Sequence, residues 1–189
     1  MPDCKGGDFR VCRGTGFCPR GQRMAGMLLS PEFGMATTKK KAVRRAKKGQ
    51  RIRQVAAIPF RLRQDGSLEV LLVTSRTTRR FIVPKGWPMK GKSGRKAATI
   101  EAQEEAGVLG KTLKQPAGTY SYWKRMTNGF IRVDVAVYLL EVTEELADWQ
   151  EAANRQRAWL PAADAALLID EPELSTLLRD LTIPATDPA

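Results

Sequence analysis

The segment from Gly86 to Val108 constrains this chain more than any other part of its sequence. Glycines punctuate residues 86–94, and the run that follows, RKAATIEAQEEAG (95–107), is rich in alanine and glutamate. Both residue types are good helix formers, and Gly107 stands where a helix C-cap is expected. We therefore expect a loop that allows close backbone approach, followed by a helix over residues 95–107.

Three glutamates of this expected helix share one face. Glu101, Glu104 and Glu105 are spaced i, i+3 and i+4, so their carboxylates project to the same side. Packing three anions together costs free energy unless a cation or solvent relieves it. Mg²⁺ prefers carboxylate oxygens and keeps several waters, which such a face can supply. A solvated acidic face is the alternative that the three glutamates alone leave open.

Basic residues surround this acidic cluster, which is the only one between Glu69 and Asp134. Those that precede it are Arg76, Arg79, Arg80, Lys85, Lys90, Lys92, Arg95 and Lys96. In phosphoanhydride hydrolysis, metal ions polarise phosphoryl oxygens and activate water, while Arg and Lys hold the flanking phosphates. The surroundings therefore favour a metal-binding, phosphate-cleaving centre over a solvated face.

Hydrophobic patterning predicts strands on both sides of the helix. A hairpin is expected from residues 54–62 and 68–75 around the turn signal Asp65-Gly66. A short strand over 80–86 should stop at Pro84 and Gly86, and strands over 119–126 and 131–143 should flank a Thr-Asn-Gly turn. Residues 157–161 are expected as an edge strand, and 164–181 as helix packed on the sheet. This order predicts an α+β or sandwich fold rather than alternating βαβ units.

Charge divides the chain into a basic tail and a polarised domain. The net charge of +12 includes 14 basic and 3 acidic residues within 1–54. Residues 55–132 hold 15 basic and 5 acidic residues, whereas 133–189 hold 3 and 12. A positive field over half of a domain suits a polyanionic ligand. We expect a disordered basic tail over residues 1–50, a domain over 51–183 and a disordered tail over 184–189.

The tail itself carries little specific signal. Residues 39–53, KKKAVRRAKKGQRIR, could attach nucleic acid or anionic surfaces, or could be a solvated, mobile arm. Cys4, Cys12 and Cys18 do not predict a zinc site, because the chain has no histidine and no fourth thiol. We interpret Met35 as a candidate true start, in which case residues 1–34 are not native.

The confinement of all cysteines to residues 1–18 argues against a disulfide framework and favours a reducing, cytoplasmic setting. No apolar run reaches 18 residues, so no transmembrane helix is expected. The start of the chain does not have the pattern of a signal peptide.

The run from Gly86 to Glu101-Ala102-Gln103-Glu104-Glu105-Ala106-Gly107-Val108 resembles the Nudix box, a glycine-loop–helix element. RFIVPKG before the box and LADWQEAANRQRAWLP after it resemble the diphosphoinositol polyphosphate phosphohydrolase branch of the Nudix hydrolase family. The likeness extends over roughly residues 54–181. It implies an α/β/α sandwich with a mixed sheet and a glycine-loop–helix catalytic element.

The resemblance also implies roles for individual residues. Glu101 and Glu105 would bind Mg²⁺ or Mn²⁺, with the backbone of Lys85 and Gly86 beside the metal. Glu104 would be the general base or a further ligand, so Glu104 and Glu101 are the expected catalytic residues. The expected contacts to substrate phosphates are Arg53, Ser75, Arg76, Arg80, Lys85, Arg132 and Arg157. For the single arginines, an ordinary surface charge is the alternative.

Three departures from the family pattern bear on activity. The box arginine that orients the first helical glutamate is Ile100 here, and the earlier box glutamate is Lys92. Another basic residue must therefore position Glu101, or catalysis will be slow. The branch also uses basic residues near its C-terminal helix, where this chain has Asp170, Glu171 and Glu173, which argues against an inositol pyrophosphate substrate.

Taken together, the sequence predicts a metal-dependent hydrolase that cleaves a pyrophosphate bond in a polyphosphorylated small molecule. A dinucleoside polyphosphate or a diphosphoinositol polyphosphate is the leading expectation, by analogy with the branch. A nucleotide-sensing Nudix module without catalysis and an RNA 5′-pyrophosphohydrolase are the alternatives. We expect a monomer or homodimer that binds no membrane, with nucleic acid as a possible partner of the tail.

Overall fold

The computed structural model describes residue 41 and residues 44–46, 48–127 and 129–183. The expectations for the cysteines, for Met35, for most of the basic tail and for residues 184–189 lie outside the described residues. Among the described residues, no helix is long and apolar enough to span a membrane.

A mixed sheet of seven strands forms the centre of the fold. The strands run in the order β3-β2-β1-β6-β5, with β4 paired to β1 and β7 paired to β2. Of these pairs, only β1 and β6 are parallel. The strands are β1 (Ile52–Leu62), β2 (Leu68–Thr74), β3 (Phe81–Ile82), β4 (Lys85–Gly86), β5 (Val108–Met126), β6 (Gly129–Glu145) and β7 (Arg157–Pro161).

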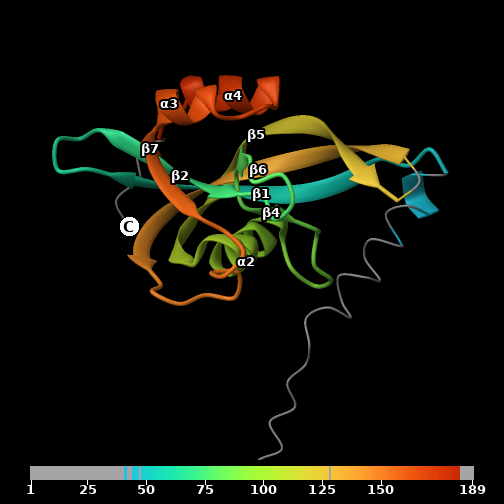
Figure 1. Ribbon diagram of the computed structural model, residues 1–189, viewed down its shortest axis with the longest axis horizontal. Helices are drawn as coiled ribbons and strands as arrows, with labels where there is room; N and C mark the ends of the chain where they lie inside the picture. Colours follow the sequence, from blue (N-terminus) through green and yellow to red (C-terminus); the bar gives the residue numbers. More distant parts are fainter. Residues whose placement is uncertain (1–40, 42–43, 47, 128, 184–189) are drawn as a thin grey trace, which may run out of the picture.

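Helices cover both faces of this sheet, as Figure 1 shows. Helix α2 (Gly94–Ala106) lies on one face, and helices α3 (Ala162–Leu167) and α4 (Pro172–Arg179) lie on the other. Each face has its own apolar core, one containing the alanines of α2 and the other Leu174 and Leu178 of α4. The fold is therefore the expected α+β arrangement, an α/β/α sandwich around a mixed sheet.

Small side chains allow α2 to lie close to the sheet. Four alanines, Ala97, Ala98, Ala102 and Ala106, are fully buried against β1 and β2. The helix starts at the N-cap Ser93, whose hydroxyl accepts from the Lys96 N–H, and ends at Gly107 with φ 62°. The predicted helix and its glycine cap are confirmed, with the helix starting one residue earlier than expected.

The predicted strand over 80–86 is interrupted. Val83 and Pro84 separate β3, which pairs with β2, from β4, which pairs with β1 at Val55 and Ala56. Proline has no N–H to donate to a ladder, but its carbonyl accepts from the Ala57 N–H at 3.0 Å. The break places Lys85 and Gly86 beside the middle of β1 and next to α2.

Strand β5 is longer than predicted, because it begins at Val108 directly after the helix cap. The predicted strand starts at residue 119, and Gly110, Pro116 and Gly118 lie before that point. The structure accommodates them at register shifts of the β5–β6 ladder. The helical stretch over 164–181 is likewise two short helices rather than one, joined at residues 168–171.

Candidate functional site

The carboxylates of α2 line a pocket of about 600 Å³. Its walls come from β1, the loop after β2, β4 with the loop that follows, α2, β5 and the segment before β7. The lining residues that carry charge are Arg76, Lys85, Lys90, Glu101, Glu104, Glu105, Lys124, Glu151 and Arg155. The three glutamates predicted from helical spacing are therefore brought together in one hollow with basic side chains.

Glu101 packs directly onto the backbone of Gly86. A Cβ atom at position 86 would overlap the Glu101 carboxylate, so any larger residue there would displace that carboxylate. The pKa of Glu101 is raised to about 8, first by burial and then by the negative charges of Glu105 and Glu104. Among the described residues, no side chain forms an ion pair with Glu101.

Glu105 is the best satisfied carboxylate of the three. Its Oε2 accepts from the Lys85 N–H at 3.0 Å, and its Oε1 forms an ion pair with Arg155. Burial raises the pKa of Glu105, although Arg155 and Lys85 counteract part of this increase. The Lys85 backbone thus lies at the acidic cluster, as expected.

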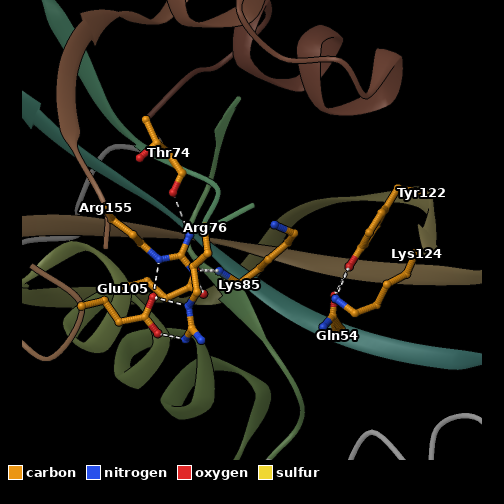
Figure 2. Close-up of polar contacts among 9 residues, drawn as sticks. Gln54, Thr74, Arg76, Lys85, Glu105, Tyr122, Lys124 and Arg155 are labelled. Atoms are coloured by element: carbon orange, nitrogen blue, oxygen red, sulfur yellow. Dashed lines mark hydrogen bonds and ion pairs between the residues drawn. The ribbon is translucent and has the colours of Figure 1, made fainter. Parts of the chain in front are cut away.

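Arg155 is a residue that the helical pattern could not reveal. Its side chain is only 5% exposed and donates to Glu151, to Glu105 and to the Thr74 carbonyl. Figure 2 shows the guanidinium between Glu105 and the Thr74 backbone. Arg155 therefore joins the end of β2, the segment before β7 and α2, which orders the acidic side of the pocket.

Glu151 extends this network to Arg76, whose side chain is partly exposed. It pairs with Arg155 and also with Arg76, whose Nε donates to Glu151 at 3.0 Å. These two arginines hold the pKa of Glu151 below its ordinary value despite burial. By contrast, burial and the charge of Glu151 raise the pKa of Glu104, which has no ion pair among the described residues.

Lys85, Lys124, Gln54 and Trp87 line another part of the pocket. Lys85 is half-buried, and desolvation of its ammonium lowers its pKa to about 8. Lys124 donates to the Tyr122 hydroxyl at 3.4 Å, and that hydroxyl donates to Gln54 at 2.6 Å. Figure 2 shows Lys124, Tyr122 and Gln54 gathered away from Arg155 and Glu105. The Lys124 ammonium also lies 5.8 Å from the centre of the Trp87 ring.

The remaining predicted contacts are distributed unevenly. Ser75 and Arg76 line the pocket. Arg53 and Arg132 line a second hollow instead, on the β1–β6–β5 part of the sheet. Arg80 forms ion pairs with Asp170 and Glu171, each at 2.9 Å, so part of the acidic charge near α4 is neutralised there.

Arg157 is held at the end of α2. Its Nη1 lies 3.3 Å from the carbonyls of Ala106, Gly107 and Leu146, and its guanidinium stacks 4.1 Å from the centre of the Trp149 ring. A positive charge here suits the C-terminal end of the helix dipole. Arg157 therefore covers the end of α2, and it also forms an ion pair with Glu145 at 4.0 Å.

The structure also shows where the two residues that depart from the box pattern lie. Ile100 is half-buried on α2, and Lys92 is exposed in the loop before that helix. A basic residue was expected to replace the box arginine at Glu101. The structure instead places Arg155 at Glu105, and Glu101 is positioned by its contact with Gly86.

The residues present fit a hard divalent cation. Within the described ranges, no three acidic, cysteine or histidine side chains converge into a closed metal cage. Mg²⁺ does not require one, because it retains several waters and is bound through one or two carboxylates plus substrate phosphates. Glu101 and Glu104, with raised pKa values and without cationic partners in the described part of the chain, supply such carboxylates.

Comparisons with known proteins agree with this geometry. A family model described as the NUDIX domain matches residues 51–181. Nudix hydrolase 12, mitochondrial, of Arabidopsis thaliana is 36% identical over 104 residues, covering 52% of this chain and 50% of that protein. Diphosphoinositol polyphosphate phosphohydrolase 2 of Mus musculus is 37% identical over 116 residues, covering 60% of each. The matches thus span about half to three fifths of those relatives.

The fold has solved counterparts. The crystal structure of a C. elegans Ap4A hydrolase binary complex superposes with a TM-score of 0.52 at 20% identity, covering 68% of this chain and 93% of that one. This likeness shows a shared fold.

Proposed function

Because this chain belongs to the Nudix hydrolase family, we propose that it is a metal-dependent enzyme that cleaves a phosphoanhydride bond in a polyphosphorylated small molecule. The observation that carries the proposal is the composition of the pocket. Three carboxylates of α2 and the cations of Lys85, Lys124 and Arg76 line the same 600 Å³ hollow. A polyphosphate with its counter-ion needs both kinds of group close together.

Glu101 would hold Mg²⁺ or Mn²⁺, and Glu104 would act either as a further ligand or as the general base. Such an ion supplies Lewis-acid polarisation of the phosphoryl oxygens and a water of lowered pKa. Glu104 is the better placed general base, because it is only partly buried, forms no ion pair among the described residues and has a pKa raised by burial and by Glu151. Water oxygen would attack phosphorus, its proton would pass to Glu104, and the P–O bond to the leaving phosphate would break.

The cationic side chains would bind the charge of the phosphate chain. Lys85 and Lys124 present ammonium groups beside Tyr122, and Arg76 presents a guanidinium from the loop after β2. Charge-assisted hydrogen bonds from these groups would orient the scissile bond and stabilise the charge that develops on the leaving group. Arg155 is a positioning residue in this scheme, since it contacts Glu105 and Glu151.

A diphosphoinositol polyphosphate or a dinucleoside polyphosphate is the substrate class that we propose. Support comes from the 37% identity to a diphosphoinositol polyphosphate phosphohydrolase and from the cationic lining of the pocket. The acidic residues near α4 weigh less against an inositol pyrophosphate than the sequence suggested, because Arg80 pairs with Asp170 and Glu171.

One observation favours a second candidate, a nucleotide-sensing module without catalysis. Glu105 is already paired with Arg155, and the box arginine and glutamate are Ile100 and Lys92. Such a pocket could bind a polyphosphate tightly while turning it over slowly or not at all.

A substrate panel separates the two candidates. We would measure phosphate or nucleotide release with Mg²⁺ and with Mn²⁺ from dinucleoside polyphosphates, diphosphoinositol polyphosphates, nucleoside diphosphate sugars and 5′-triphosphate RNA. The enzyme predicts release from one class that stops in EDTA. The sensor predicts thermal stabilisation by one of these ligands without any product.

A further inference from the structure

A second hollow, of about 820 Å³, lies away from the carboxylates, on the part of the sheet formed by β1, β6 and β5. One face of the β5–β6 hairpin borders it. On this face, Trp123 stands opposite Arg132 and Arg125 stands opposite Phe130 in the antiparallel ladder. Residues two apart on a strand point the same way, so these four side chains share one side of the hairpin. With Arg53 of β1 they form what we term the aromatic–arginine face.

The aromatic side chains of this face are unusually accessible. Trp123 is 68% exposed and Phe130 is 64% exposed. Their neighbours along each strand alternate with them, and Tyr122 and Ile131 on the other side pack against the core. The exposure is therefore a property of this one side, and it leaves two flat ring surfaces open to a ligand.

The charge around these rings is positive. The hollow is lined by Arg51, Arg53 and Arg132, and among the described residues Asp134 is the one acidic side chain in its lining. Asp134 forms an ion pair with Arg132 at 3.9 Å, so the three arginines leave an excess of two positive charges. Arg44, Arg45 and Lys48 precede β1 and add to the positive charge of the same stretch of chain.

We propose that the aromatic–arginine face binds single-stranded nucleic acid. Rings that stack on bases, next to arginines that contact phosphates, are the combination that binds single strands without sequence preference. A duplex would not satisfy it, because its bases are stacked on one another. A second copy of this chain is disfavoured, because a two-fold contact would bring the arginines of both copies together. Gln54 lines both hollows, so a bound strand would lie beside the candidate catalytic pocket.

Binding can be measured by fluorescence anisotropy on the full chain, with a labelled 15-nucleotide RNA, the same sequence as DNA, and the matching duplex. We expect binding to both single strands and weaker binding to the duplex. Trp123→Ala and Phe130→Ala should each weaken single-strand binding on the order of tenfold. Arg132→Gln should also reduce the dependence of affinity on salt concentration.

Matched controls come from other surfaces. Leu167 on α3 is 77% exposed, and Arg95 is exposed on α2, so Leu167→Ala and Arg95→Gln should bind like the wild type. Unchanged affinity in both aromatic variants would overturn the proposal and place any binding in the basic segment before β1. A dimer that Trp123→Ala dissociates, without single-strand binding, would also overturn it in favour of self-association. None of these outcomes depends on hydrolysis in the other pocket.

Discussion

At the residue scale, the contact between Glu101 and Gly86 has an energetic consequence. This half-buried carboxylate has a pKa of about 8, against 4.5 in the unfolded chain. A folded state with the higher pKa binds an extra proton between these values, so the contribution of Glu101 to folding stability is fully present below pH 4.5 and is lost as the pH rises to about 8. A divalent cation bound to Glu101 would offset this loss.

This argument predicts how Glu101→Gln behaves without metal. In EDTA the variant should resemble the wild type at pH 4.5 and be the more stable protein at pH 8.5, by on the order of 4 kcal/mol. Excess Mg²⁺ should raise the stability of the wild type at pH 8.5 and leave the variant unchanged. Urea unfolding at both pH values provides the measurement, and equal stabilities at pH 8.5 would count against a buried, metal-ready Glu101.

Arg155 gives a second prediction at this scale. Its side chain and that of Glu105 are 5% and 10% exposed, so Arg155→Met leaves the Glu105 carboxylate buried without its ion-pair partner, while Glu151 keeps Arg76. Removing one member of a buried ion pair costs about 3–5 kcal/mol. Arg155→Met/Glu105→Gln should recover part of that loss, because it also removes the carboxylate that lost its partner. If urea unfolding shows no loss in Arg155→Met, the guanidinium does not order the acidic side of the pocket.

The sequence predicted the part of the site that is local and missed the part that is not. Glu101, Glu104 and Glu105 could be grouped because helical spacing alone places them on one face. Gln54, Lys124 and Arg155 come from three other elements, and no periodicity relates them to α2. Arg53 and Arg132 were assigned by analogy, yet they meet in a different hollow because Arg132 lies on the hairpin face turned away from the pocket.

At the scale of elements, the C-terminal end of α2 is held by contacts with Trp149 and Arg157. Gly107 adopts φ 62°, and a Cβ there would meet the Trp149 ring at 2.6 Å, while the Arg157 guanidinium stacks 4.1 Å from the centre of that ring. Gly107→Ala should therefore lower the free energy of unfolding by about 2–4 kcal/mol, from left-handed strain and overpacking.

Gly91 supplies the matched control for this prediction. It has φ 73°, but no atom lies within 4 Å of its added Cβ. Gly91→Ala should therefore cost only the strain, about 1 kcal/mol. Thermal or urea unfolding of both variants separates the two contributions, and equal losses would mean that Trp149 does not clamp the helix end.

The elements were predictable wherever a strong pattern stood alone. Helix α2, the β1–β2 hairpin and edge strand β7 follow from propensity, a turn signal and a terminating proline. The first half of β5 was missed because Gly110, Pro116 and Gly118 are breakers in isolation. Pairing with β6 outweighs them in the folded chain, with irregularities in the register at those positions.

At the scale of the whole molecule, one sheet supports two hollows of different chemistry. One part of β1 pairs with β4 and another part pairs with β2. Strand β4 thereby lies beside the carboxylates of α2, and both line the first pocket. The long β5–β6 hairpin extends the sheet past the helices and carries the second hollow, as Figure 1 shows for the hairpin. We propose the domain bounds of 51–183 on this basis, which agree with the family match over 51–181.

The most direct test of the account is the turnover of the fastest substrate in Mg²⁺ by the wild type, Glu104→Ala, Glu101→Gln and Glu144→Gln. Glu144 is exposed on β6 and lines neither hollow, so it controls for loss of a carboxylate elsewhere. We predict that the two α2 variants fall by at least about a hundredfold in kcat while remaining folded. Glu144→Gln should match the wild type. Undiminished turnover in both α2 variants would show that the chemistry does not take place at this helix.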